Sequence, residues 1–126
     1  MSDVPSHLRY TAEHEWITTA EPGEVGTVGI TASAAAALGD IVYLELPTVG
    51  SAVEAGAVVG EVESTKSVSE LFSPVSGTVV DVNQTAVDDP SVVNAAPYGE
   101  GWLFTVEVSA PGALISAEEY AAQITD

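Results

Sequence analysis

The chain reads Val58-Val59-Gly60-Glu61-Val62-Glu63-Ser64-Thr65-Lys66-Ser67-Val68-Ser69-Glu70 at its centre. The first six residues form a short apolar run that is typical of a β-strand, and the polar residues that follow predict a turn. Lys66 stands at the tip of this turn between small hydroxyl side chains, so its stem is expected to project freely. Its ammonium group is a poor nucleophile near neutral pH, but a modifying enzyme can reach a lysine on an exposed turn. From these residues alone, an ordinary surface lysine stays an open alternative.

Further short apolar runs lie on both sides of this stretch. Strands are predicted over residues 27–30, 41–46, 78–82 and 102–108. Turn signals that contain Gly and Pro, such as Glu21-Pro22-Gly23, separate them. Many short strands at this spacing favour a small sandwich or barrel, and the length favours one domain over residues 1–126.

Two segments have helical character. The alanine-rich run from Ser33 to Leu38 is followed by Gly39, a residue typical of the ends of helices. Ser116 and Glu119 form an S-x-x-E capping box, which predicts a helix over residues 116–124. The apolar stripe of this helix is expected to consist of Leu114, Ile115, Tyr120 and Ile124.

The charge balance excludes several classes of partner. The chain has 19 acidic residues against two basic ones, Arg9 and Lys66, and its formal net charge is −17. Binding to nucleic acid or to an anionic membrane surface needs many cations, so neither is expected. No apolar stretch approaches the roughly 20 residues that span a bilayer. The opening residues, 1–5, show no basic region before an apolar run, so no secretory signal and a cytoplasmic location are expected.

The residues offer no catalytic or metal-binding constellation. The chain has no cysteine, and His7 and His14, its two histidines, do not lie at ligand spacing. No nucleophile–base pair, phosphate-binding loop or calcium loop is apparent, so neither an enzyme nor a metal site is predicted. The carboxylates of Glu13-His14-Glu15-Trp16 can be interpreted in two ways. On a strand, they form either a solvated face over a buried Trp16 or a pair that recognises a cation.

Several motifs, taken in order and spacing, resemble one family over almost the whole chain. They are Tyr10-Thr11-Ala12-Glu13-His14-Glu15-Trp16, Val28-Gly29-Ile30-Thr31, Leu38-Gly39-Asp40-Ile41-Val42, Leu46-Pro47-Thr48-Val49-Gly50, Gly60-Glu61-Val62-Glu63-Ser64-Thr65-Lys66-Ser67, Ser73-Pro74-Val75-Ser76-Gly77, Asn83, Asn94 and Pro97-Tyr98-Gly99-Glu100-Gly101-Trp102-Leu103. The chain resembles the H-protein family of the glycine cleavage system, whose members are lipoyl carriers. The resemblance implies a mainly β barrel-sandwich hybrid of two short antiparallel sheets, with peripheral helices and a C-terminal helix.

The same resemblance implies a role for Lys66 and a set of partners. Lys66 would carry lipoate in amide linkage, and the chain would be a non-catalytic shuttle. The arm would take the aminomethyl group of glycine from the glycine decarboxylase (P protein) to the aminomethyltransferase (T protein). The dihydrolipoyl dehydrogenase (L protein) would then reoxidise it, and a lipoate ligase or lipoyl/octanoyl transferase would install it.

The resemblance also implies a cleft that shelters the loaded arm. By matched position its acidic residues are Glu13, Glu15 and Glu70, which would pair with the ammonium of the cargo. His14 is expected to be structural. Ala32 departs from the family pattern, which commonly has an acidic residue there, and the alanine-rich helix offers few polar contacts to the arm.

Other functions stay open as alternatives. Biotin carriers place Met beside the lysine, whereas this chain has Thr65 and Ser67, and the lipoyl domains of 2-oxoacid dehydrogenases usually show Asp before it. An H-like protein could instead relay lipoyl groups to other enzymes. A non-carrier interaction module, in which Lys66 is incidental, is the alternative from a different class.

Overall fold

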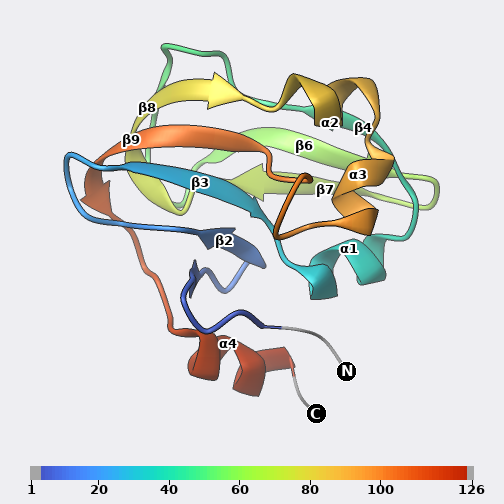
Figure 1. The fold of residues 1–126 in the computed structure, drawn as a ribbon, viewed down its shortest axis with the longest axis horizontal. Coiled ribbons are helices and arrows are strands. Elements are labelled where there is room, and N and C mark those ends of the chain that lie inside the picture. The colour runs from blue at the N-terminus through green and yellow to red at the C-terminus, as the bar shows by residue number, and fades with distance from the viewer. Residues whose placement is uncertain (1–3, 125–126) are drawn as a thin grey trace.

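The computed structural model describes residues 4–124, and the fold is shown in Figure 1. Residues 1–3, which belong to the segment in which no secretory signal is expected, lie outside the described residues, as do residues 125 and 126. The strands are β1 (Arg9–Tyr10), β2 (Glu15–Ile17), β3 (Val25–Ile30), β4 (Ile41–Glu45), β5 (Ala52–Val53), β6 (Val58–Ser64), β7 (Val68–Phe72), β8 (Val75–Val82) and β9 (Phe104–Pro111). The helices are α1 (Ala32–Leu38), α2 (Gln84–Asp88), α3 (Ser91–Ala95) and α4 (Ala117–Ile124).

The strands form two antiparallel sheets. A six-stranded sheet has the order β1-β2-β3-β9-β8-β5, and a three-stranded sheet has the order β4-β6-β7. The buried faces of both sheets contribute to one apolar cluster, in which Val28, Leu44, Val62, Val79 and Val106 are all at most 3% exposed. The mainly β barrel-sandwich hybrid expected from the family resemblance is therefore confirmed.

A second apolar cluster lies between the start of the chain and its C-terminal helix. Figure 1 shows α4 packed below β2 and the N-terminal segment. Tyr10, Trp16 and Tyr120 are each at most 2% exposed there, and the rings of Tyr10 and Tyr120 stack at 4.8 Å. The C-terminal helix thus closes over the six-stranded sheet at β1 and β2.

The predicted strands and helices all form, with changes at their ends. The expected capping box is present, because the Ser116 amide donates to Glu119 Oε1 and the Glu119 amide donates to Ser116 Oγ. Leu114 departs from its predicted place in the stripe of α4, since it packs against the main cluster instead. Helices α2 and α3 were not predicted. Each has five residues and no side-chain cap hydrogen bond, so it carries little local signal.

Candidate functional site

A tight hairpin turn presents Lys66 to solvent. Strands β6 and β7 pair up to Glu63 and Val68, and the turn between them is closed by the Ser64 amide donating to the Ser67 carbonyl at 2.8 Å. The Ser64 hydroxyl oxygen also accepts from the amides of Lys66 and Ser67 at 3.3 and 3.1 Å. Ser64, two residues before the lysine, therefore orders the backbone of the turn, while the Lys66 side chain stays exposed.

The turn rests on the loop that joins α1 to β4. The Thr65 amide donates to the Asp40 carbonyl at 3.0 Å. Gly39 has a φ of 85°, and a Cβ built on it would lie 3.5 Å from Lys66 Cε, so the stem of the lysine passes over this glycine. Asn94 on α3 holds the same loop, because its amide group donates to the Gly39 carbonyl and accepts from the Ile41 amide, each at 2.9 Å. Hydrogen bonds therefore hold both the turn that bears the lysine and the loop beneath it.

A cavity of about 160 Å³ brings the three predicted carboxylates together. Glu13, Glu15 and Glu70 all line it, although Glu70 comes from β7 and the other two precede or begin β2. Its other lining side chains are largely apolar and belong to α1, β3 and β6: Ile30, Ala34, Ala37, Leu38 and Val62. Leu38 directly precedes Gly39, over which the Lys66 stem passes, so the cavity begins beside the turn.

Glu15 is the buried member of the three, with 1% of its surface exposed. Its Oε1 accepts from the Thr11 hydroxyl at 2.6 Å, and its Oε2 accepts from the Phe72 amide at 3.1 Å. Burial raises the pKa of Glu15 from 4.5 to about 7, although both hydrogen bonds oppose the rise. The carboxyl therefore joins β2 to the end of β7, and a cation beside it would favour its ionised form.

Glu13 to Trp16 do not all lie on one strand, so the common face that a strand would give to Glu13 and Glu15 does not form. Strand β2 begins only at Glu15. His14 has a φ of 74°, a backbone conformation that residues other than Gly rarely adopt. The Thr11 hydroxyl oxygen accepts from the amides of Glu13 and Glu15, each at 3.2 Å, and so stabilises a turn. The two carboxylates share a cavity because of this turn, and Glu15 is not part of a solvated face.

His14 is more closely involved in this region than its sequence context indicates. It lines the same cavity as the carboxylates, and its Nδ1 lies 2.7 Å from the Tyr120 hydroxyl. Ser69 also lines the cavity. Contacts that span more than a hundred residues, like that of His14 with Tyr120, leave no local signal in a sequence. The cap that Thr31 forms on α1 was detectable, since Thr before an alanine run is a typical N-cap.

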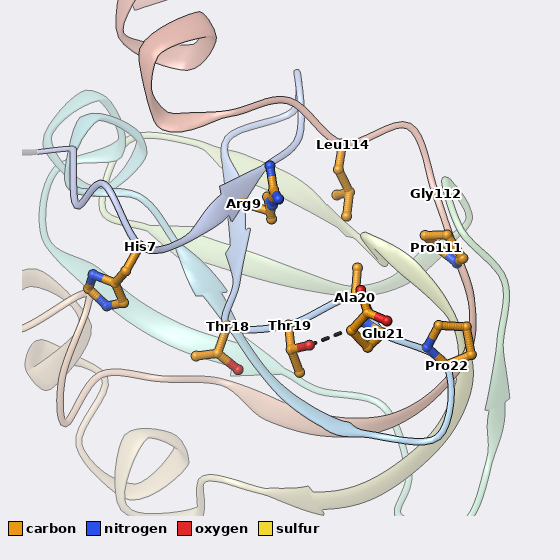
Figure 2. Close-up of a pocket in the computed structure, with 10 residues that line it drawn as sticks. All are labelled: His7, Arg9, Thr18, Thr19, Ala20, Glu21, Pro22, Pro111, Gly112 and Leu114. Atoms are coloured by element: carbon orange, nitrogen blue, oxygen red, sulfur yellow. Dashed lines mark hydrogen bonds between the residues drawn. The ribbon is translucent and has the colours of Figure 1, made fainter.

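A larger cavity lies at another part of the surface (Figure 2). It has a volume of about 530 Å³, and Figure 2 shows Arg9 and Leu114 on one side of it and Thr18, Thr19 and Glu21 on the other. Neither Lys66 nor any of the three carboxylates lines it. Its size therefore says nothing about the lysine-bearing turn.

The chain is similar to known proteins over most of its length. The family model for the glycine cleavage H-protein matches residues 8–126. The glycine cleavage system H protein of Streptomyces avermitilis is 61% identical over 117 residues, which cover 92% of this chain and 93% of that protein. The H protein of Thermobifida fusca is 59% identical over 124 residues, covering 98% and 96% respectively. A crystal structure of an H protein from Mycobacterium marinum matches with a TM-score of 0.92 and 51% identity, covering 95% of this chain and 98% of that one.

Proposed function

The chain belongs to the glycine cleavage H-protein family, and on that premise we propose that Lys66 is the residue that bears its lipoyl group. Members of this family are lipoyl carriers that shuttle between the P, T and L proteins of the glycine cleavage system. The chain is accordingly a carrier component and not a catalyst. What the proposal adds is the attachment residue and the surface that receives the arm.

The observation that carries the proposal is the placement of Lys66. It is the single lysine of the chain, and it stands exposed on a turn that Ser64 orders and that Asp40 anchors. An enzyme that acylates an amine needs an accessible side chain on a backbone of defined shape. A rigid turn meets both needs, because it presents the ammonium group without requiring the carrier to unfold locally.

The cavity beside the turn has the chemistry to receive a lipoyl arm. A lipoyl group on Lys66 would supply the disulfide chemistry by which the aminomethyl group is taken up. We propose that Ala34, Leu38 and Val62 contact the hydrocarbon part of the arm and exclude water. Glu13, Glu15 and Glu70 then pair with the cationic amine of the cargo. Glu15 is buried, so its charge pair lies in surroundings where it is stronger than in bulk water.

We also propose which enzymes modify the carrier, where this takes place and how far the carrier domain extends. A lipoate ligase or a lipoyl/octanoyl transferase modifies Lys66, and this takes place in the cytoplasm. The whole of residues 1–126 acts as one carrier domain, which is supported by the packing of α4 on β1 and β2. Within residues 4–124, no helix has the length and apolarity needed to cross a bilayer.

Intact mass spectrometry after co-expression with a lipoate ligase tests the attachment residue. We expect the mass to increase by one lipoyl group and peptide mapping to place it on Lys66. Lys66→Arg, which keeps the positive charge, should stay unmodified with an unchanged circular dichroism spectrum, because the position is an exposed turn. A parent protein that stays unmodified under these conditions, or a lipoyl group on the N-terminal amine instead, would contradict the proposal.

A further inference from the structure

We propose that Tyr120, on the C-terminal helix, is a positioning residue that holds both walls of the arm cavity in place. The inference rests on the proposed function, because it assigns a role to a residue behind the cavity that is proposed to shelter the arm. Tyr120 does not line that cavity itself. Its hydroxyl contacts His14, which lines the cavity, and Thr31, which caps a helix that lines the cavity.

The first wall is the turn that carries the carboxylates. His14 lies between Glu13 and Glu15, and its left-handed backbone, with a φ of 74°, persists only where the surroundings hold it. The Tyr120 hydroxyl meets His14 Nδ1 at 2.7 Å, and the two rings meet edge to face with centroids 5.6 Å apart. Gln123, one turn further along α4, donates its side-chain amide to the Ala12 carbonyl at 3.1 Å. Helix α4 thus supports this turn at two points.

The second wall is α1, which contributes Ala34, Ala37 and Leu38 to the cavity. This helix has seven residues and is nearly all alanine, so it depends on its cap and on packing. Its cap is Thr31, a fully buried residue whose hydroxyl oxygen accepts from the Ala34 amide at 3.1 Å. The Tyr120 hydroxyl lies 2.7 Å from that same Thr31 oxygen.

One hydroxyl therefore joins both walls in a chain of hydrogen bonds. The Ala34 amide donates to Thr31, the Thr31 hydroxyl can donate to Tyr120, and the Tyr120 hydroxyl can donate to a neutral His14 at Nδ1. The Thr31 amide also donates to the His14 carbonyl at 3.0 Å, so the two walls are joined through backbone as well. Removing the Tyr120 hydroxyl leaves the buried Thr31 hydroxyl and the half-buried His14 ring with one partner fewer each. It also releases the side-chain link between the walls.

The test compares Tyr120→Phe with Tyr10→Phe. Both changes remove one phenolic hydroxyl from the same stacked pair of buried rings. The Tyr10 hydroxyl, however, donates to the Pro5 carbonyl at 2.6 Å, and neither of these residues lines the cavity. Amide hydrogen exchange of the unlipoylated proteins is the first readout. We expect exchange over residues 13–15 and 32–38 to become roughly threefold to tenfold faster in Tyr120→Phe and to stay near that of the parent in Tyr10→Phe.

The second readout is the lifetime of the aminomethyl-loaded arm after lipoylation. We expect it to be several-fold shorter in Tyr120→Phe, while Tyr10→Phe keeps the lifetime of the parent. Thr31→Val breaks the same chain at its next link and should give both changes if Tyr120→Phe folds poorly. A Tyr120→Phe lifetime equal to that of the parent, or an equal loss in Tyr10→Phe, would overturn the inference. If the parent protects its arm no better than a free lipoyl-lysine peptide does, the proposed cavity function fails, and the inference fails with it.

Discussion

Glu15 decides the electrostatics of the cavity at the scale of single residues. It is buried, its carboxyl oxygens accept from Thr11 and Phe72, and its pKa is raised to about 7. A carboxyl with this pKa is partly protonated near neutral pH. An ammonium group that arrives beside it shifts it toward the ionised form, so the pairing of cargo and cavity includes the release of a proton.

The substitution Glu15→Gln tests this pairing. We expect the loaded arm to be hydrolysed several-fold faster, because an amide cannot pair with the cationic amine as a carboxylate does. Lipoylation of Lys66 should be unaffected, since Glu15 lies in the cavity and not on the turn. The measurement is the rate of cargo release from the isolated loaded protein. If that rate matches the parent's, Glu15 is not a partner of the amine.

The same residue makes folding stability depend on pH. The native state binds the Glu15 proton more tightly than the unfolded state, with pKa values of about 7 and 4.5, so stability falls as pH rises across this window and levels off above it. We expect the loss attributable to Glu15 to be about 3 kcal/mol. Urea unfolding of the parent and Glu15→Gln at several pH values measures it, because Gln keeps the shape and does not titrate. Parallel pH profiles in the two proteins would be evidence against the raised pKa.

The elements around the lysine are joined in series by hydrogen bonds. Helix α3 holds the loop from Gly39 to Ile41 through Asn94, and that loop anchors the β6–β7 turn through Asp40 and Thr65. Helix α1 ends at this loop and lines the cavity. Short helices with little intrinsic stability are therefore stabilised by the contacts that build the site.

Asn94→Ala should destabilise the loop from Gly39 to Ile41, on which the lysine-bearing turn rests. It removes two hydrogen bonds to the loop, so we expect a loss of about 1–3 kcal/mol in the free energy of unfolding. The Thr65 amide should exchange faster with solvent, and Lys66 should be lipoylated more slowly because its backbone is less ordered. Gln84→Ala on α2 is the control, since it removes an exposed amide whose hydrogen bond to Asp88 stays within that helix. Unchanged exchange at Thr65 would show that the loop does not need Asn94.

At the scale of the whole molecule, several carboxylates lie side by side on the lysine-bearing sheet. Glu45, Glu61 and Glu70 are paired across β4, β6 and β7 and form a row of carboxylates on that sheet. Like charges opposite one another are unfavourable within the carrier, but they raise the local negative potential beside Lys66. Partner surfaces that approach the turn are therefore expected to be basic.

Association with the P protein should weaken as ionic strength increases, because salt screens such an attraction. We expect Glu45→Lys to reduce the association rate several-fold at low salt. Glu107→Lys, which makes the same charge change on β9 of the other sheet, should have a smaller effect. Stopped-flow or surface plasmon resonance measurements over a salt series compare the two. Docking that is independent of salt, or equal effects of both changes, would count against a directed field.

The sequence by itself determined the alternation that forms the main strands, the capping box of α4, the position of Lys66 on a hairpin turn and the family. These features are local or depend on ordered motifs, so they can be read along the chain. The family resemblance implied a shared cleft for Glu13, Glu15 and Glu70, and the structure places all three on one cavity. Only the tertiary structure decided that Glu15 is buried and that Tyr120 connects His14 to Thr31. The physical reason is that these contacts join segments far apart in sequence, where packing and the left-handed turn at His14 override the strand pattern.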